Sequence, residues 1–374
     1  MIGDQNQRIP WAPNGVVLDG EIGKGIRVAV TGASHWHLPR YAAHLREAAA
    51  TVVAVADRDQ SVAERWAAQL GAAAARNTDD IMRHRPDVVL ALGRPCDMAA
   101  QAVELLDAGV PLLAEKPLGI SPEEVAHVAQ TAARRGAWVA VALVRRYDPI
   151  WWVLDRLAEE DVLGRVAHAH MRIVNGPPQR YVAWGSDWML DRSLAGGGAL
   201  LNLGIHGMDF IRHLADEPLT VVGAAVGAAE DRGRNPALGL DTKGSGGIED
   251  YAVVTLRSAS GVLASVEAGY TYPDAAAGMT RAGDSETRIG ASGAYLTERD
   301  GALRAITERG ESPHGGPDRC AGDRYRDWLF DSLARLRRGA APVADVRDCL
   351  EAVSLVFDAY RCAGVTRVGG DAAG

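Results

Sequence analysis

The chain has 374 residues, of which 47% are hydrophobic and 24% charged, and its formal net charge is -8. This length and composition predict a folded globular protein of two domains, and an acidic excess without a Lys/Arg-rich run argues against a nucleic-acid partner. We find no signal peptide and no stretch of the roughly 18 apolar residues that a membrane span needs, so we expect no membrane partner and a cytoplasmic location. The cysteines form no C-x-x-C pair, which argues against a disulfide framework and a metal site.

The first part of the chain alternates short apolar runs with amphipathic stretches. Residues 1–25 are rich in Pro and Gly and are predicted to be a flexible N-terminal extension. Residues 26–147 contain the runs IRVAVTG, TVVAVAD, DVVLALG, VPLLAEKP and WVAVALV, separated by predicted helices over 41–49, 61–70 and 98–108 and from 121 onward. This alternation predicts a doubly wound parallel sheet, the α/β fold of a dinucleotide-binding Rossmann domain.

The second part has a different pattern. Residues 148–345 begin with a predicted helix over 149–160 and then contain several strands joined by tight Gly/Ser turns, interrupted by a Gly-rich run that leads into a helix. We expect an α+β domain with an open, mostly antiparallel sheet, suited to substrate binding and oligomerisation. Residues 346–374 are predicted to form a C-terminal helix and tail that pack back on the first domain.

The first predicted strand ends at Gly32, where a dinucleotide-binding domain places its phosphate loop. The G-x-G-x-x-G pattern is incomplete here, because Ser34 and His37 replace its second and third glycines. Backbone N–H groups of the loop, together with the Ser34 hydroxyl, can still face a pyrophosphate. His35 and Trp36 complete this candidate cofactor loop. The alternative is an ordinary tight turn with surface histidines.

Asp57 ends the second predicted strand, where an acidic residue commonly binds the adenosine ribose hydroxyls of a dinucleotide. A carboxylate repels the 2′-phosphate of NADP, so NAD is the expected cofactor. Arg58 leaves NADP possible, because a guanidinium can bind that phosphate. The alternative for Asp57 is a solvated residue at a strand end.

Glu115 and Lys116 follow an apolar strand at the edge where ligands collect in parallel sheets. A buried ammonium group needs a partner, which we expect to be Glu115, a cofactor ribose or a substrate hydroxyl. The alternative is a surface lysine before a turn at Pro117.

Three glycines, residues 196–198, precede a helix that carries Asn202, His206 and Asp209. Asn202 and His206 are four residues apart and are expected on one helix face, and the glycines should let the backbone approach a ligand. Histidine can transfer the proton of an alcohol during hydride transfer. The alternative is a hydrogen-bonded histidine of the core.

These signals occur together with AEKPLG at 114–119, RRYDP at 145–149 and GGGALLNLGIHGMDF at 196–210. With these motifs the chain resembles, over residues 26–368, the glucose–fructose oxidoreductase/inositol dehydrogenase/rhizopine-catabolism (Gfo/Idh/MocA) family of NAD(P)-dependent oxidoreductases. The resemblance implies a Rossmann domain followed by an open-sheet domain, and assembly into a homodimer or homotetramer.

The resemblance also implies roles for individual residues. Lys116 would orient the cofactor ribose and the substrate hydroxyl, and His206 would transfer the alcohol proton. Asn202 stands where the family usually has an aspartate; it is the third catalytic candidate, and Asn202→Asp should raise the pKa of His206. Arg94 and Pro95 replace a Thr-Pro or Ser-Pro pair and are further cofactor-binding candidates.

The candidate substrate contacts lie in segments that border the crevice in relatives. Aromatic rings with interspersed polar groups suit a sugar or cyclitol ring, although core packing explains the aromatic residues nearly as well. Besides Asn202 and His206, these candidates are Arg146, Tyr181, Trp184, Asp187, Trp188 and Tyr270.

The resemblance predicts an NAD(P)-dependent oxidoreductase that acts on a secondary alcohol or ketone of a sugar, sugar derivative or cyclitol. Two alternatives stay open. One is a cofactor-binding regulatory or scaffold protein on the same fold, and the other is transient oxidation of a sugar that allows elimination of a glycosidic substituent.

Overall fold

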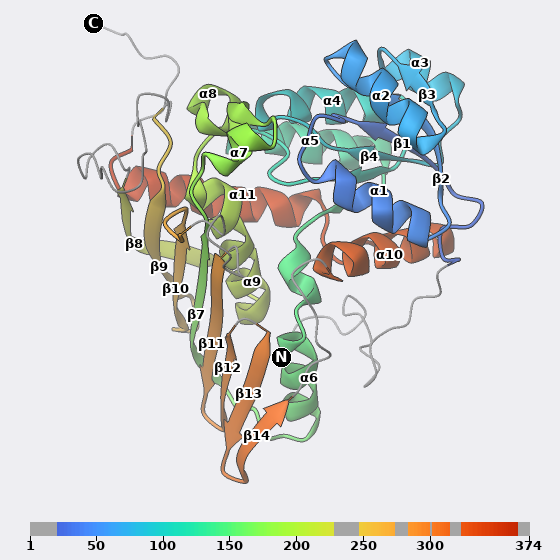
Figure 1. Ribbon diagram of the computed structural model, residues 1–374. Coiled ribbons are helices and arrows are strands. Elements are labelled where there is room, and N and C mark those ends of the chain that lie inside the picture. Colours follow the sequence, from blue (N-terminus) through green and yellow to red (C-terminus); the bar gives the residue numbers. More distant parts are fainter. Residues whose placement is uncertain (1–20, 228–246, 274–282, 300, 315–322, 366–374) are drawn as a thin grey trace, which may run out of the picture.

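The computed structural model describes residues 21–227, 247–273, 283–299, 301–314 and 323–365. It contains a parallel sheet flanked by helices and a second, larger sheet that is almost entirely antiparallel (Figure 1). This architecture confirms the predicted fold class. Residues 1–20 of the predicted extension and residues 366–374 of the predicted tail lie outside the described ranges. In the described ranges, no helix has the length and apolar character needed to cross a membrane.

The first sheet has six parallel strands in the order β3-β2-β1-β4-β5-β6. Its central strands are buried along almost their whole length, as continuous apolar runs predict. The strands are β1 (Arg27–Thr31), β2 (Thr51–Ala56), β3 (Ala73–Ala75), β4 (Val88–Ala91), β5 (Leu112–Ala114) and β6 (Val139–Val141). The helices between them are α1 (Leu38–Glu47), α2 (Gln60–Leu70), α3 (Thr78–Arg83), α4 (Pro95–Asp107) and α5 (Pro122–Arg135).

The second sheet has eight strands in the order β14-β13-β12-β11-β7-β10-β9-β8. Only β7 and β10 pair in parallel. Burial alternates along β9, so one face of the sheet is packed, and α6 and α9 lie against that face (Figure 1). The strands are β7 (Val166–Asn175), β8 (Leu219–Gly227), β9 (Tyr251–Ser258), β10 (Leu263–Gly269), β11 (Gly283–Ala291), β12 (Ala294–Arg299), β13 (Ala302–Thr307) and β14 (Gly310–His314).

In the described part of the chain, two helical segments lie between β6 and β7, and five lie between β7 and β8 and carry much of the candidate site. The longer ones are α6 (Ile150–Glu159) and α9 (Ile205–Ala215). The short ones are η2 (Val144–Tyr147), α7 (Arg180–Ala183), η3 (Asp187–Leu190), α8 (Arg192–Ala195) and η4 (Leu200–Gly204), the last of which is a π-helix.

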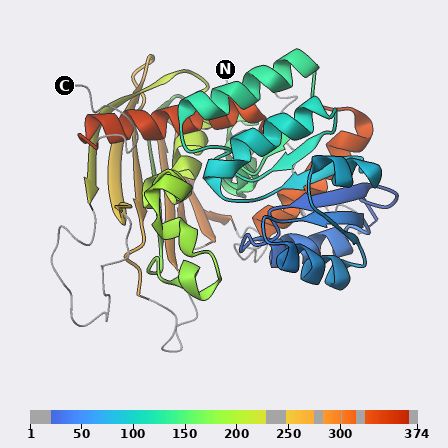
Figure 2. The ribbon, with the colours of Figure 1, turned by 90° about the horizontal axis from the view of Figure 1, so that it is seen from above.

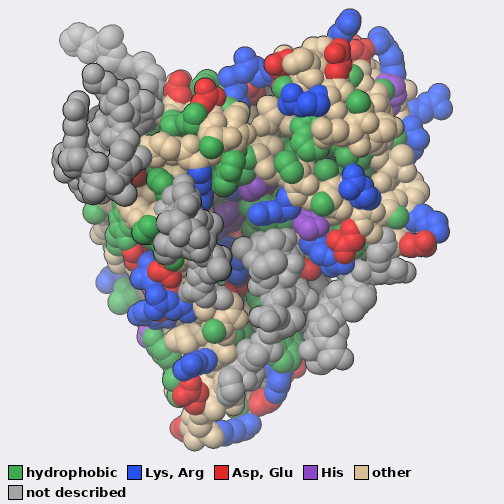
Figure 3. Space-filling view, viewed as in Figure 1, with side chains coloured by type: hydrophobic (Ala, Val, Ile, Leu, Met, Phe, Trp, Pro, Cys, Tyr) green, Lys and Arg blue, Asp and Glu red, His purple; other side chains and the backbone are tan. Residues whose placement is uncertain are grey.

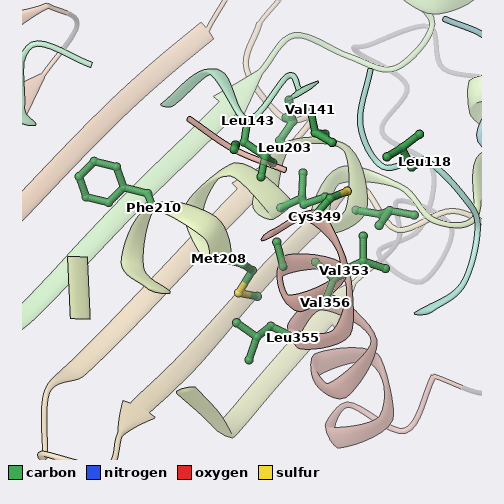
Figure 4. Packing of buried hydrophobic residues seen from close by; sticks show 14 of the residues in the cluster. Leu118, Val141, Leu143, Leu203, Met208, Phe210, Cys349, Val353, Leu355 and Val356 are labelled. Carbon is green, nitrogen blue, oxygen red and sulfur yellow. The ribbon is translucent and has the colours of Figure 1, made fainter. Parts of the chain in front are cut away.

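The last two helices, α10 (Asp323–Arg338) and α11 (Val346–Cys362), join the halves. Residues 323–345 fall within the predicted second domain, yet α10 packs on α1 of the first, because Trp328 and Phe330 enter the same cluster as Tyr41. Helix α11 lies across both halves and contacts α5, α9 and β8 (Figure 2). Figure 4 shows its side chains Cys349, Val353 and Val356 packed among residues of both halves. One core therefore continues through the molecule.

Candidate active site

A pocket lies where the loops after β1, β4 and β5 face the second half. The space-filling view shows a recess between the halves in which histidine side chains are visible (Figure 3). Parallel sheets bind ligands at this carboxyl edge. The pocket is lined by His35, Trp36, Gly93, Pro95, Glu115, Lys116, Pro117, Trp188, Met189, Ala195, Gly197, Leu201 and Asn202.

The loop after β1 turns at Gly32, which has a φ of 65° and whose hydrogen faces the Leu92 carbonyl too closely for any side chain. Asp57 anchors this loop, because its carboxylate accepts the Ser34 N–H at 2.7 Å. The Ser34 backbone donor is therefore already used within the protein. Across residues 33–37, only the Trp36 N–H has no acceptor among the described residues.

The aromatic side chains of the loop meet the second half. His35 stacks on Trp36 with ring centroids 4.0 Å apart, and Trp36 lies 5.4 Å from Trp188 and 5.1 Å from Tyr181. Burial, His37 and Lys116 lower the pKa of His35 to about 3, so its ring is neutral. The cofactor candidates of the first half and the substrate candidates of the second thus form one aromatic cluster.

Glu115 is buried and accepts three hydrogen bonds. Its donors are the His37 ring Nδ1 and the Tyr41 hydroxyl, both at 2.7 Å, and the Lys116 backbone N–H at 3.2 Å. Burial alone would raise the pKa of this carboxyl, but its neighbours His37, His35 and Lys116 hold it below the ordinary value. His37 replaces the third glycine of the G-x-G-x-x-G pattern and directly precedes α1. Its bond to Glu115 therefore links the start of α1 to the end of β5. Tyr41 was not among the predicted site residues.

Lys116 is held by Asn202. Its Nζ lies 2.7 Å from both the backbone oxygen and the side-chain Oδ1 of Asn202, so the expected contact of the ammonium with Glu115 is not the one observed. The amide Nδ2 of Asn202 donates to the hydroxyls of Tyr181 and Tyr270, both at 2.8 Å. Burial lowers the pKa of Lys116 to about 8 despite the opposing charge of Glu115. The ammonium group can therefore lose its proton near neutral pH.

His206 lies on α9 with 7% of its surface exposed. Its Nδ1 is buried and has no hydrogen-bond partner among the described residues. Burial, Lys116 and Arg145 lower its pKa well below the ordinary value, so the imidazole is neutral. The side chain of Asn202 bonds Lys116 and the two tyrosines Tyr181 and Tyr270, so the expected effect of Asn202→Asp on the pKa of His206 stays a prediction. A π-helix at 200–204 replaces the regular helix expected between the two residues, a feature frequent at functional sites.

The glycine run packs closely against other parts of the protein, and Gly197 also lines the pocket. A Cβ on Gly198 would clash with the Glu249 carbonyl, and one on Gly197 would clash with the Tyr360 hydroxyl. Both are groups of the protein itself and not a ligand. The Glu249 carboxylate accepts the N–H groups of Gly198 and Leu200 at 2.9 Å and the Tyr360 hydroxyl at 2.6 Å. Glu249 thereby fixes the start of η4; the sequence analysis missed it, because no local pattern marks a partner about 50 residues away.

Arg146 is not in the pocket, which corrects its assignment as a substrate contact. Its guanidinium binds Asp209 at 2.6 and 2.9 Å, Asp348 at 2.8 Å and the Val343 carbonyl at 2.7 Å. The neighbouring Arg145 binds Asp148 at 3.1 Å. The RRYDP motif is therefore an internal ion-pair centre.

Other predicted site residues also lie outside the pocket lining: Gly32, Ser34, His37, Asp57, Arg58, Arg94, Tyr181, Trp184, Asp187, His206 and Tyr270. Arg94 bonds Asp97 at 2.7 Å, and Trp184 is 51% exposed. Arg58 and Asp187 are exposed. The predicted site residues that line the pocket are His35, Trp36, Pro95, Glu115, Lys116, Trp188 and Asn202. Tyr181 and Tyr270 adjoin it through Asn202.

A Rossmann sheet whose binding edge faces a second domain is the arrangement of a nicotinamide-dependent oxidoreductase. Two family models match the chain: the oxidoreductase family with an NAD-binding Rossmann fold over residues 26–143, and the GFO/IDH/MocA C-terminal domain over residues 151–292. The protein belongs to the Gfo/Idh/MocA family of NAD-binding oxidoreductases.

The chain is 28% identical to dTDP-3,4-didehydro-2,6-dideoxy-alpha-D-glucose 3-reductase of Saccharopolyspora spinosa over 257 residues, 67% of this chain and 70% of the relative. It is 28% identical to inositol 2-dehydrogenase 2 of Paenarthrobacter aurescens over 354 residues, 89% of this chain and 94% of the relative. The fold is similar to that of GenD2 from gentamicin A biosynthesis, solved in complex with NAD, with a TM-score of 0.72, 21% identity, and coverage of 91% of this chain and 94% of GenD2.

Proposed function

We propose that this protein transfers hydride between NAD and a secondary alcohol or ketone of a sugar, sugar derivative or cyclitol. The observation that carries the proposal is the pair Lys116 and His206, two buried polar groups whose hydrogen-bonding capacity the described residues leave unfilled. Two relatives support this substrate class, because one is named as a sugar-nucleotide reductase and the other as an inositol dehydrogenase.

The residues at the carboxyl edge of the first sheet fit a dinucleotide. The Asp57 carboxylate at the end of β2 has lone pairs beyond those used by Ser34 and Asp59 and would bind the ribose hydroxyls. The unpaired N–H of Trp36 would donate to a phosphate oxygen, and Trp36 and Pro95 would flank the part of the cofactor that enters the pocket. When bound, NAD supplies the group that accepts or returns the hydride.

Two side chains of this chain would handle the substrate oxygen. Lys116 uses two of its three N–H donors on Asn202, and the third is available to hold the oxygen of the reacting carbon. His206 is neutral and can accept the hydroxyl proton as the alcohol becomes a ketone and the hydride leaves. In the reverse direction, the same ring nitrogen returns the proton.

A turnover screen tests the proposal. Sugars, sugar acids and cyclitols would be mixed with NAD or NADP and followed by nicotinamide absorbance, with Lys116→Met and His206→Asn as matched controls. We expect turnover of at least one polyol, lost in both variants. Tight NAD binding without turnover of any of them would contradict the proposal and favour a regulatory protein. Release of a glycosidic substituent without net absorbance change would favour the elimination reaction instead.

A further inference from the structure

One amide group organises two buried tyrosines beside Lys116. Tyr181 of α7 and Tyr270 after β10 are each 2% exposed, and both hydroxyls lie 2.8 Å from the Nδ2 of Asn202. An amide nitrogen can only donate, and it has two hydrogens. Both phenol oxygens are therefore acceptors in this contact, and each tyrosine keeps its own proton to give elsewhere.

The two tyrosines lie side by side and differ in their other contacts. Their ring centroids are 5.8 Å apart, and burial together with Tyr181 raises the pKa of Tyr270 well above its ordinary value. Tyr270 therefore keeps its hydroxyl proton. The Tyr181 hydroxyl receives hydrogen bonds from Asn202 and, at 3.4 Å, from Arg180, but its own proton has no acceptor among the described residues.

The Tyr181 hydroxyl lies next to the candidate active site. Asn202 Oδ1 binds Lys116 while its Nδ2 binds Tyr181, so a single amide group separates the ammonium from the phenol oxygen. The Tyr181 ring also packs against Trp36, which lines the pocket. A buried hydroxyl that lacks an acceptor is unfavourable unless a ligand supplies one.

We propose that Tyr181 determines specificity by donating a hydrogen bond to an oxygen on the carbon next to the reacting carbon, and that Asn202 and Tyr270 position it. This assignment rests on the proposed function, in which Lys116 and His206 hold the reacting oxygen. The ligand chemistry is a vicinal diol or hydroxyketone of a polyol ring.

The amide at position 202 is essential to this arrangement. A carboxylate can only accept, so an aspartate would draw the protons of both tyrosines toward itself. The phenol of Tyr181 would then have no proton for the substrate. Asn202→Asp would therefore reverse the direction of two hydrogen bonds.

The experiment compares Tyr181→Phe with Tyr270→Phe on the polyol found in the screen and on its monodeoxy analogues. For the parent polyol we expect Tyr181→Phe to lower kcat/KM about tenfold, as loss of one hydrogen bond predicts. For the one analogue that lacks the contacted oxygen, Tyr181→Phe and wild type should have the same kcat/KM. Tyr270→Phe should cause a smaller loss that is equal for all analogues.

NAD titration and thermal unfolding of each variant show whether it is intact. If Tyr181→Phe fails to fold, Asn202→Asp provides the second test. In that variant, the parent polyol and the analogue that lacks the contacted oxygen should have the same kcat/KM. The proposal is overturned if the loss in Tyr181→Phe is the same for every analogue, or if Tyr270→Phe shows the oxygen-specific loss instead. Those results, with wild-type turnover intact, leave the proposed function standing, whereas absence of wild-type turnover on all polyols removes both.

Discussion

The RRYDP segment and the Lys116 site are both buried and charged, yet their hydrogen bonding differs. Each guanidinium nitrogen of Arg146 has an acceptor, supplied by Asp209, Asp348 and a backbone carbonyl. At the candidate active site, His206 Nδ1 has no partner among the described residues, and Lys116 uses two of its three donors. Buried polar groups with complete partners maintain a fold, whereas incomplete ones are candidates for chemistry.

The largest expected effect is on turnover. Lys116→Met and His206→Asn should each lower kcat about 10²–10⁴-fold, because a positioned proton-transfer or orienting group is removed. Steady-state kinetics on the substrate from the screen measures the loss, and calorimetric NAD titration is the control. A His206→Asn variant with near-normal kcat would show that the unfilled Nδ1 has no chemical role.

The next effect is on stability. Arg146→Met should lower the free energy of unfolding by about 3–5 kcal/mol, because it removes both hydrogen bonds from the buried Asp209 and leaves it only the longer contact with Arg212 at 3.8 Å. The matched control is Arg135→Met, whose pair with Asp107 is 54% and 49% exposed; its loss should cost less than about 1 kcal/mol. Denaturant titration compares the two. If Arg146→Met were as stable as wild type but raised KM, Arg146 would belong to the site after all.

A smaller effect is expected in the pH profile. Lys116 must be protonated to donate to the substrate oxygen, so kcat/KM should fall as the pH rises through about 8. In Asn202→Asp, a carboxylate replaces the amide whose Oδ1 lies 2.7 Å from the Lys116 Nζ. The negative charge favours the ammonium form of Lys116, so the fall in kcat/KM should occur about one pH unit higher. Profiles of the two proteins test this expectation. An unshifted fall would mean that another group is responsible for it.

The smallest effect concerns the cofactor. Asp57→Asn keeps an acceptor for the Ser34 N–H but removes the charge, so the preference for NAD over NADP should fall by about tenfold. Arg58→Ala is the paired variant and should leave NAD binding unchanged. Calorimetric titration with both cofactors gives the ratio, and an unaltered ratio in Asp57→Asn would assign the preference to another residue.

Local patterns predicted most of the fold and several residues that line the pocket. The apolar runs ending at Asp57 and Glu115 became parallel strands because period and composition determine such strands without reference to distant residues. Lys116, Asn202 and His206 were found because their motifs are contiguous. Short elements such as β3 and α3 were not predicted, since a few residues carry too little periodicity.

The sequence did not predict which residues far apart along the chain would form hydrogen bonds or ion pairs with each other. Arg146 was expected to contact a substrate because its segment borders the crevice in relatives, and only the folded chain shows that Asp209 and Asp348 bind its guanidinium group. Tyr41 and Glu249 were missed for the converse reason. Their contacts with Glu115 and Tyr360 join residues 74 and 111 positions apart, which no local pattern can indicate.

Helix α10 has a consequence for how the protein is made. Trp328 and Phe330 belong to the same apolar cluster as Val30 and Tyr41, and the Trp328 indole donates to the Val141 carbonyl at 3.1 Å. When only the first 150 residues have been synthesised, the α10 side chains that cover part of the first sheet are therefore still missing. Domains generally fold from the N-terminus as they emerge, but here the nascent nucleotide-binding half must keep an apolar surface exposed until translation is almost finished.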